Sequence, residues 1–244
     1  MSDSKPQEKP ALLLFPNVLG EVKHHAPYLP VSVDKAVSSL DGLIAESPTA
    51  GRRYLARFTT KKPLNEVPIA VFNEHTPDED IDFLLKPIRD GERWGLISDG
   101  GLPCIADPGA NLVRRANESG ISVQAFIGPS SLMLALMLSG LPAQRFYFAG
   151  YVDKEPLKRE KEIKELQQQS KADGSTQIII ETPYRNKHLL DSLLSTLDKN
   201  TRLCVAWDLT LPTQGVVSQK IEQWKKSPLP NLDKKTAVFL FVHA

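Results

Sequence analysis

The sequence predicts an α/β protein with two domains. Short apolar runs, some of them continuous, as in Ile178–Ile180 and Val238–Val242, alternate with stretches of helical apolar spacing. This alternation is typical of βαβ units with mainly parallel or mixed sheets, and continuous apolar strands are expected where both faces of a sheet are covered. About ten strands exceed one small sheet. We therefore expect an N-terminal α/β domain over residues 11–127 and a C-terminal one over 128–244, behind a flexible tail of residues 1–10.

Each element follows from a local pattern. The expected strands are apolar runs that end at proline, glycine or polar turn residues. They cover Ala11–Phe15, Leu43–Ala45, Val67–Phe72, Gly95–Ile97, Ser122–Ile127, Phe146–Tyr151, Gln177–Ile180, Arg202–Trp207 and Thr236–Val242. The expected helices have apolar residues at helical spacing, in some cases with an acidic first turn or a glycine stop. They cover Pro30–Leu43, Gly51–Phe58, Asp78–Arg89, Asn111–Glu118, Ser130–Ser139, Lys154–Lys171, Asn186–Leu197 and, more weakly, Ser218–Lys226.

The composition of the 244 residues excludes several classes of protein. Hydrophobic residues make up 41% and charged residues 24%, which is ordinary for a globular chain and excludes disordered or fibrous ones. The net charge is only +1, so a nucleic-acid partner would have to be bound by a local basic patch. The two cysteines, Cys104 and Cys204, form neither a disulfide framework nor a zinc motif, which favours a reducing compartment; we expect no metal site.

One stretch, residues 119–144, carries no charge and is long enough in principle to cross a bilayer. It is interrupted by Gly128-Pro129 and by Gly140-Leu141-Pro142, which favours a strand, a turn and a buried helix. The first ten residues are polar and lack the apolar region of a signal peptide. We therefore expect no membrane span and a cytoplasmic location.

Ligands of open α/β sheets bind outside the carboxyl ends of the strands. The residues that follow the expected strands are rich in proline, glycine and small polar groups, as in Ser98–Pro103 and Gly128–Ser131. The chain has no GxxxxGK[ST], GxGxxG, GxSxG or HExxH sequence, which argues against nucleotide hydrolysis, ordinary dinucleotide binding and the common hydrolases. Three carboxylates at strand ends, Glu46, Glu181 and Asp208, are candidates for a general base, or else cap backbone groups.

The best candidate for phosphate contact is a cluster of basic residues without an acidic neighbour. It consists of Arg52, Arg53, Arg57, Lys61 and Lys62. A solvated surface is the alternative interpretation. Further basic residues between Lys154 and Lys164 alternate with glutamates, so ion pairing explains them.

Five segments in order resemble the tetrapyrrole methylase superfamily of S-adenosylmethionine-dependent methyltransferases. Within it they resemble the branch of the small-subunit ribosomal RNA ribose methyltransferases. The segments are Leu96–Val113 (LISDGGLPCIADPGANLV), Ile127–Leu132 (IGPSSL), Ser139–Pro142 (SGLP), Phe148–Tyr151 (FAGY) and Ile180–Arg185 (IETPYR).

The resemblance implies that S-adenosylmethionine, the methyl donor, lies in a cleft between the two domains, commonly in a homodimer. It implies that Asp99, Gly100 and Gly101 contact the methionine portion through main-chain groups, and that Thr182 and the turn at Asp208 approach the adenosine. The full donor set that it implies is Pro16, Asp99, Gly100, Gly101, Ile105, Ser130, Ser131, Thr182, Asp208, Leu209 and Ala237. For Ile105 and Ala237, plain core packing is an equal alternative.

The chain departs from the branch on the side that would face the acceptor. Pro16–Gly20 stands where the branch has TPIGN, Ala45–Thr49 (AESPT) where it has AEDTR, and Asp208–Leu211 (DLTL) where it has ELTK. The leading hypothesis is methylation of RNA, namely a ribose hydroxyl of small-subunit ribosomal RNA. Two alternatives remain open: methylation of a small molecule, and a catalytically silent homologue that binds RNA or the ribosome.

Overall fold

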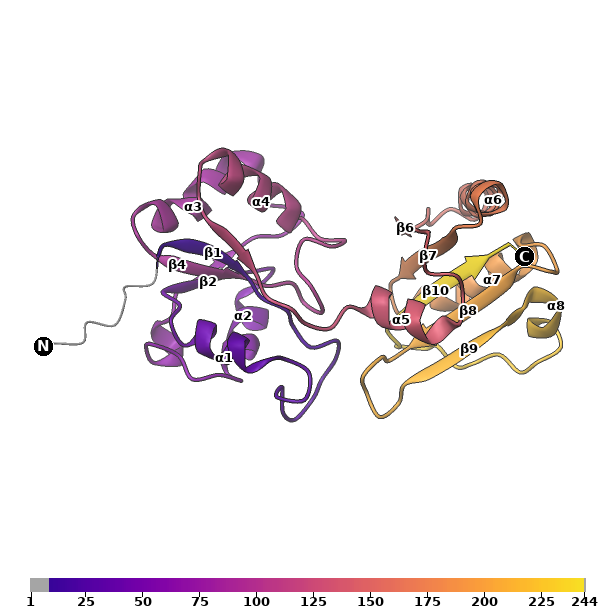
Figure 1. Ribbon diagram of the computed structural model, residues 1–244, viewed down its shortest axis with the longest axis horizontal. Helices are drawn as coiled ribbons and strands as arrows, with labels where there is room; N and C mark the ends of the chain where they lie inside the picture. Colours follow the sequence, from indigo (N-terminus) through magenta and orange to yellow (C-terminus); the bar gives the residue numbers. More distant parts are fainter. Residues whose placement is uncertain (1–8, 244) are drawn as a thin grey trace, which may run out of the picture. The chain divides into compact units, whose positions relative to one another are not determined.

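The computed structural model describes residues 9–243 and divides into two compact units, one ending at Pro129 and one beginning at Ser130 (Figure 1). Each unit contains one five-stranded sheet with helices packed against it. The predicted α/β class with parallel and mixed sheets is thereby confirmed.

The sheet of the N-terminal unit is parallel throughout, in the order β3-β2-β4-β1-β5. Its elements are β1 (Ala11–Leu14), α1 (Val31–Val37), β2 (Gly42–Ala45), α2 (Pro48–Leu55), β3 (Ile69–Val71), α3 (Ile81–Arg89), β4 (Arg93–Leu96), α4 (Gly109–Glu118) and β5 (Val123–Ala125). Short 3-10 turns cover Leu64–Glu66 and Asp78–Asp80. In Figure 1, α1 and α2 cover one face of the sheet, and α3 and α4 cover the other.

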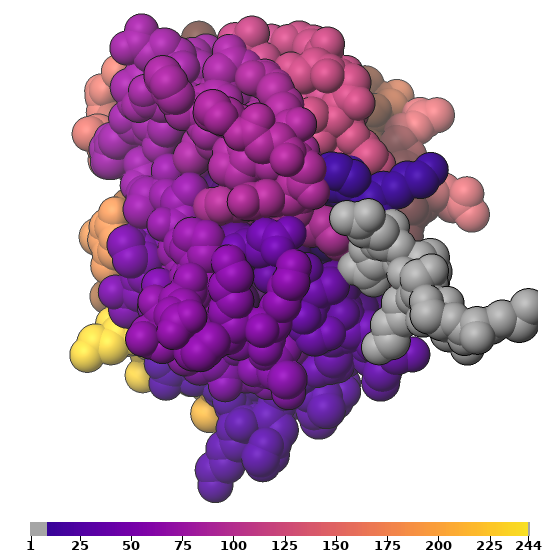
Figure 2. Space-filling model, turned by 90° about the vertical axis from the view of Figure 1, so that its left-hand side faces the viewer, coloured from indigo at the N-terminus to yellow at the C-terminus, as the bar shows by residue number. Residues whose placement is uncertain are grey.

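A buried apolar cluster lies on each side of this sheet. One cluster contains Phe15 and the fully buried Tyr54 of α2. The other contains Trp94 of β4 and Leu112 of α4. Both faces of the strands are therefore covered, which explains their continuous apolar sequences. Figure 2 shows the outside of this unit, with the darker violet residues of its earlier segments below and the purple residues of its middle segments above.

The sheet of the C-terminal unit is mixed, in the order β6-β7-β10-β8-β9. Its elements are α5 (Ser131–Ser139), β6 (Phe146–Gly150), α6 (Pro156–Asp173), β7 (Thr176–Glu181), α7 (Asn186–Thr196), β8 (Arg202–Trp207), β9 (Gly215–Lys220), α8 (Ile221–Trp224) and β10 (Ala237–Val242). β6 and β7 are parallel, and the other neighbours are antiparallel. Because β10 runs between β7 and β8, its first residue, Ala237, pairs with both Glu181 and Trp207.

The weak helix expected over Ser218–Lys226 is wrong for its first residues. Ser218 pairs with Cys204 in an antiparallel ladder, and the strand continues to Lys220 before the short α8 begins. β9 is an edge strand in which every residue is half-buried, so it lacks the clear alternation that marks a strand in a sequence. Pairing with β8 overrides the local helical spacing.

The uncharged stretch of residues 119–144 forms β5, a turn and the nine-residue helix α5. No helix within residues 9–243 is both long and apolar enough to cross a membrane.

Candidate functional site

Strand pairing places the residues that follow β1, β2 and β4 beside one another at one edge of the N-terminal sheet. Asn17 and Gly101 exchange two main-chain hydrogen bonds, with N–O distances of 2.7 and 3.2 Å. Three groups of predicted site residues, at Pro16, Glu46 and Asp99, therefore lie at this edge. We call it the N-terminal edge.

The Asn17 side chain holds the N-terminal edge together. Its Nδ2 donates to the carbonyl oxygens of Ser98 (3.0 Å) and Asp99 (3.1 Å). Its Oδ1 accepts from the main-chain nitrogen of Val18 (2.9 Å) and from Nη1 of Arg57 (3.0 Å). Asn17 is buried, so these four bonds satisfy a polar group that water does not reach. The amide thus fixes the loop after β4 to the end of β1.

The loop after β4 presents main-chain atoms to solvent. Asp99 and Gly100 are exposed, and a Cβ on Gly100 would have only the Val18 carbonyl oxygen within 4 Å, at 3.5 Å. Gly101 has φ +78°, a conformation that favours glycine. An exposed glycine backbone of this kind allows close approach of a ligand.

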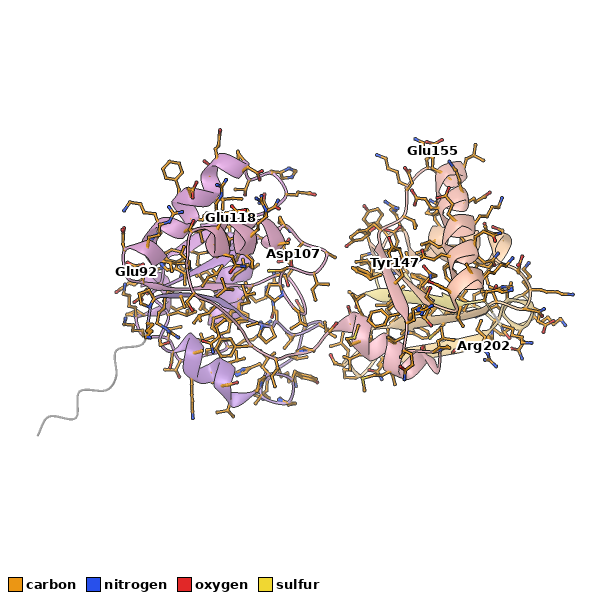
Figure 3. The ribbon with its side chains drawn as sticks, turned by 45° about the horizontal axis from the view of Figure 1, so that its top comes forward. Glu92, Asp107, Glu118, Tyr147, Glu155 and Arg202 are labelled. Atoms are coloured by element: carbon orange, nitrogen blue, oxygen red, sulfur yellow. The ribbon has the colours of Figure 1, made fainter. Side chains whose placement is uncertain are left out.

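Backbone strain is concentrated just beyond this loop. Cys104 and Ala106 have positive φ values of 69° and 63° and flank Ile105, whose side chain is 45% exposed. The Asp107 carboxylate holds this turn by accepting from the main-chain nitrogens of Cys104 (2.9 Å) and Gly109 (2.7 Å). Figure 3 labels Asp107, which lies ahead of α4. Strained non-glycine residues are typical of ligand-binding loops, and here they hold an apolar side chain in solvent.

A second set of predicted residues meets at one edge of the C-terminal sheet, which we call the C-terminal edge. Because Ala237 pairs with Glu181 and Trp207, Thr182, Asp208 and Ala237 are neighbours there. Asp208 (φ 47°) and Thr210 (φ 73°) are again strained non-glycine residues. Of the five such residues within 9–243, four therefore lie in the two loops that the sequence predicts to contact the donor.

The remaining predicted donor residues lie at the start of α5 and in or next to the C-terminal sheet. Ser130 is the N-cap of α5, where its Oγ accepts from the main-chain nitrogen of Met133 at 3.4 Å, and Ser131 is the first residue of that helix. Leu209 is buried in the turn after β8, and Ala237 is buried in β10. The burial of Ala237 agrees with the alternative interpretation that this residue packs in the core. Leu209 is buried to a similar extent.

The three candidate bases have different surroundings. Glu181 is buried, and its two oxygens bind Arg185 Nη2 (2.7 Å) and the main-chain nitrogen of Thr182 (2.7 Å). Asp208 Oδ2 is bound by Lys235 Nζ (2.5 Å) and by the Thr213 hydroxyl (2.7 Å). Both carboxylates are therefore ion-paired and hydrogen-bonded, which favours a structural role.

Glu46 differs from the other two carboxylates because no cation pairs with it among the described residues. Its Oε1 accepts one hydrogen bond, from the main-chain nitrogen of Asp99 at 3.0 Å. Burial raises the pKa of the Glu46 carboxyl, the Asp99 hydrogen bond opposes this, and the Asp99 and Asp107 charges raise it further. A carboxylate that retains a proton more strongly than usual is a better general base near neutral pH.

A pocket of about 210 Å³ opens at the N-terminal edge, and it brings predicted donor and phosphate-contact residues together. Its lining includes Asn17, Ser47, Arg53, Arg57 and Asp99. The guanidinium groups of Arg53 and Arg57 give this pocket its positive charge, and the Glu21 and Asp99 carboxylates lie in the same lining.

The other residues of the basic cluster lie elsewhere. Arg52 donates to the carbonyl oxygens of Leu64 and of Val67 (2.7 Å), so it anchors the segment before β3. Lys61 pairs with Asp41 at 2.6 Å. Lys62 is exposed in the same loop. The cluster therefore contributes two arginines, Arg53 and Arg57, to the pocket. Within residues 9–243 no group of three metal-ligating side chains occurs.

The sequence did not single out Asn17, Asp107 or Lys235, although each fixes a predicted loop. Asn17 was visible only as a turn residue after the first strand. Lys235 precedes β10, and its pairing with Asp208 follows from the antiparallel neighbours of β10, which the sequence does not show. Asn17 and Lys235 lie within three positions of a strand end, so a strand-end signal could have found them. Asp107 lies eleven residues after the end of β4, where that signal does not reach.

Solved structures share the α/β fold of this chain. The structure of the methyltransferase CobJ superposes with a TM-score of 0.65 at 15% identity, covering 96% of this chain and 94% of that one. Diphthine synthase gives 0.61 at 16% identity, covering 95% and 90%. At these identities the likeness establishes the fold.

The sequence comparisons establish the family. Residues 29–225 match the model of the Tetrapyrrole (Corrin/Porphyrin) Methylases. The chain belongs to this family and is a methyltransferase, which confirms the resemblance carried by the five segments.

Curated relatives bear the name "Ribosomal RNA small subunit methyltransferase I". The protein from Thermotoga maritima is 30% identical over 200 residues, 80% of this chain and 85% of the relative. The proteins from Xylella fastidiosa and Halalkalibacterium halodurans are 33% and 34% identical over 168 residues. The match spans only 58% and 56% of the length of these two relatives.

Proposed function

We propose that the chain transfers a methyl group from S-adenosylmethionine to RNA, at a ribose hydroxyl of the small-subunit ribosomal RNA. The observation that carries the proposal is the position of Glu46. Its carboxylate binds the Asp99 loop, and that loop and two arginines line one pocket. The names of the curated relatives support the same acceptor class. A homodimer in the cytoplasm is part of the proposal.

The donor residues in this proposal belong to both edges. Main-chain groups of Asp99, Gly100 and Gly101 would contact the methionine portion, with Ile105 packing nearby. Thr182 and the Asp208–Leu209 turn would contact the adenosine. The exposed glycine backbone and the strained turns support this choice, because such features persist where a ligand needs them. Pro16, Ser130, Ser131 and Ala237 complete the proposed set.

The chemistry needs alignment and one proton acceptor. The sulfonium of S-adenosylmethionine supplies an activated methyl group. The acceptor hydroxyl would lose its proton to the Glu46 carboxylate while its oxygen bonds to the methyl carbon and the carbon–sulfur bond breaks. The neutral thioether leaves, and Glu46 later returns the proton to water. Asn17 would keep the Asp99 loop in position, so that little reorganisation precedes the reaction.

We expect S-adenosylmethionine to raise the thermal unfolding midpoint of the purified protein. At a ligand concentration of about 100 times the dissociation constant, the gain is about 2.7 kcal/mol, because the ligand binds the folded state only. Differential scanning calorimetry with S-adenosylmethionine, its demethylated product and adenosine checks this. No shift with either sulfur-containing ligand would contradict the donor site and favour the silent RNA-binding alternative.

Methyl transfer from radiolabelled S-adenosylmethionine to purified small ribosomal subunits, and to their naked RNA, tests the acceptor. A small-molecule acceptor would leave both unlabelled while the thermal shift persists. That result would contradict the proposed RNA acceptor and support the proposed donor site.

Replacing Arg53 by glutamate should weaken RNA binding. The Arg53 side chain is 60% exposed and lines the pocket, with one distant ion pair to Glu21 at 3.9 Å. Loss of one phosphate contact should reduce the slope of log affinity against log salt by about 0.7 for a single strand. Fluorescence anisotropy over a salt series measures it, with Lys35→Glu on α1 as a control of equal charge change. Equal effects of the two variants would show that net charge, and not the pocket, governs binding.

A further inference from the structure

The C-terminal unit contains a second pocket, of about 380 Å³, between the start of α7 and the segment before β10. Tyr184, Lys187 and His188 line one side, and Leu229 and Pro230 line the other. None of the residues proposed for the donor is in its lining. The volume lies within the range of small-ligand pockets, which is about 300–1,000 Å³.

The pocket is held open by a buried amide. Asn186, the first residue of α7, is fully buried, and its Nδ2 donates to the carbonyl oxygens of Leu232 (3.3 Å) and Lys235 (2.7 Å). These bonds tie the helix start to the opposite wall. The two walls are therefore fixed before any ligand arrives, which reduces the entropy cost of binding.

The aromatic side chain at the entrance is unusually accessible. Tyr184 is 77% exposed, whereas tyrosine is on average a residue of intermediate burial. Leu229, 47% exposed, provides a second apolar surface in the same pocket. A flat ligand can stack on the phenol ring, and the nucleic-acid bases are the flat ligands that aromatic platforms commonly bind.

Basic and acidic side chains line the pocket together with Tyr184. Lys187 and His188 are exposed on the first turn of α7, and neither has an ion pair within residues 9–243. The Asp191 and Asp233 carboxylates also line the pocket. A cation suits a phosphate, and a carboxylate accepts hydrogen bonds from the amino group of a base. A nucleotide has a flat base for the aromatic ring, a phosphate for the cation and, in most bases, an amino or imino group for a carboxylate. A purely apolar or purely anionic ligand would use only one of these groups.

We propose that this pocket binds one unstacked nucleotide of a single-stranded RNA segment, with its base on Tyr184 and its phosphate at Lys187. The inference rests on the proposed RNA acceptor, and it adds a contact point in the C-terminal unit whose lining contains none of the proposed donor residues. It therefore predicts that the enzyme recognises an unpaired segment of the RNA in addition to the reacting nucleotide.

The test uses the full chain with short fluorescein-labelled oligouridylate and oligoadenylate. Tyr184→Ala should weaken binding about five- to hundredfold, because stacking on one aromatic residue has an effect of this size. Tyr184→Phe keeps the ring and should bind like the wild type. Lys187→Ala should lower the salt slope by about 0.7, the contribution of one phosphate on a single strand. Phe83→Ala, an equally exposed aromatic residue on α3, and Lys164→Ala on α6 are the matched controls.

A photoreactive 4-thiouridine oligonucleotide gives a second readout. We expect its crosslink in the peptide that contains Tyr184, and its loss in Tyr184→Ala. The inference is overturned if the wild type binds neither oligonucleotide, or if Tyr184→Ala and Phe83→Ala behave alike. If oligonucleotides bind at Tyr184 and small subunits accept no methyl group, the pocket stands and the proposed acceptor fails. The two failures are thus distinguishable.

Discussion

Glu46→Gln is expected to lower the turnover number for methyl transfer by about a hundred- to ten-thousandfold, the usual contribution of a general base. Glutamine has the size of glutamate, and its carbonyl oxygen can still accept the hydrogen bond from the main-chain nitrogen of Asp99. The loop therefore keeps its anchor, and only the ability to take a proton is lost. Donor affinity should change by less than about twofold, well under the tenfold that 1.4 kcal/mol represents.

The pH dependence of the wild type provides an independent check. Because burial raises the Glu46 pKa, the carboxyl is protonated and inactive at pH values where an ordinary glutamate, with a pKa of about 4.3, is already charged. Activity should rise with pH through this raised pKa. In Glu46→Gln, the residual activity should lack that ionisation. The measurement is the turnover number between acid and neutral pH at saturating donor and acceptor.

Glu74→Gln is the matched control, since Glu74 is exposed in a loop of the same unit and contributes only a distant charge to Glu46. Wild-type turnover in Glu46→Gln would show that Glu46 merely positions the Asp99 loop. In that case Glu46→Ala, which also removes the acceptor of the hydrogen bond, should raise the dissociation constant of the donor. A role of Glu46 as a general base is thus seen as a change in turnover, and a role as an anchor of the Asp99 loop is seen as a change in donor binding.

The sequence predicts those parts of the fold that depend on local patterns. Continuous apolar strands such as β10 can be recognised because every residue of the strand is buried. Amphipathic helices such as α3 can be recognised because the burial of one face imposes a helical period. β9 was missed because its pairing with β8 is a tertiary contact that leaves no periodic signal. The order of the strands in each sheet cannot be predicted from the apolar pattern either, because it depends on tertiary contacts.

For the candidate site, the sequence predicts which loops form it. The strand-end rule and the motifs selected Asp99, Thr182 and Asp208, and the sheet registers gather these loops at one edge of each sheet. The hydrogen bonds that decide the role of each side chain could not be read from the sequence. Asn17 binds Ser98 across 81 residues of chain, and the guanidinium of Arg52 is held by carbonyl oxygens that any sequence would supply.

Asn17→Ala is expected to reduce both folding stability and donor affinity. It removes four hydrogen bonds of a buried amide and leaves the Ser98 carbonyl, the Val18 N–H and the Arg57 guanidinium without this partner. One buried unsatisfied group costs about 1–3 kcal/mol. Since some of these groups will find water, we expect the unfolding free energy to fall by about 2–4 kcal/mol in urea titrations, with an unchanged slope.

The effect on the donor follows from the same contacts. Without the Asn17 amide, the described contacts that still hold the Asp99 loop are the main-chain pair between residue 17 and Gly101 and the hydrogen bond from the Asp99 N–H to Glu46. The donor must then order the rest of the loop, and fixing one residue costs about 1–2 kcal/mol, which is a roughly five- to thirtyfold loss of affinity. Isothermal titration calorimetry with S-adenosylhomocysteine measures it, with Asn111→Ala on the surface of α4 as the control. A destabilised variant that binds the donor like the wild type would restrict Asn17 to a structural role, because the loop would then be ordered without it.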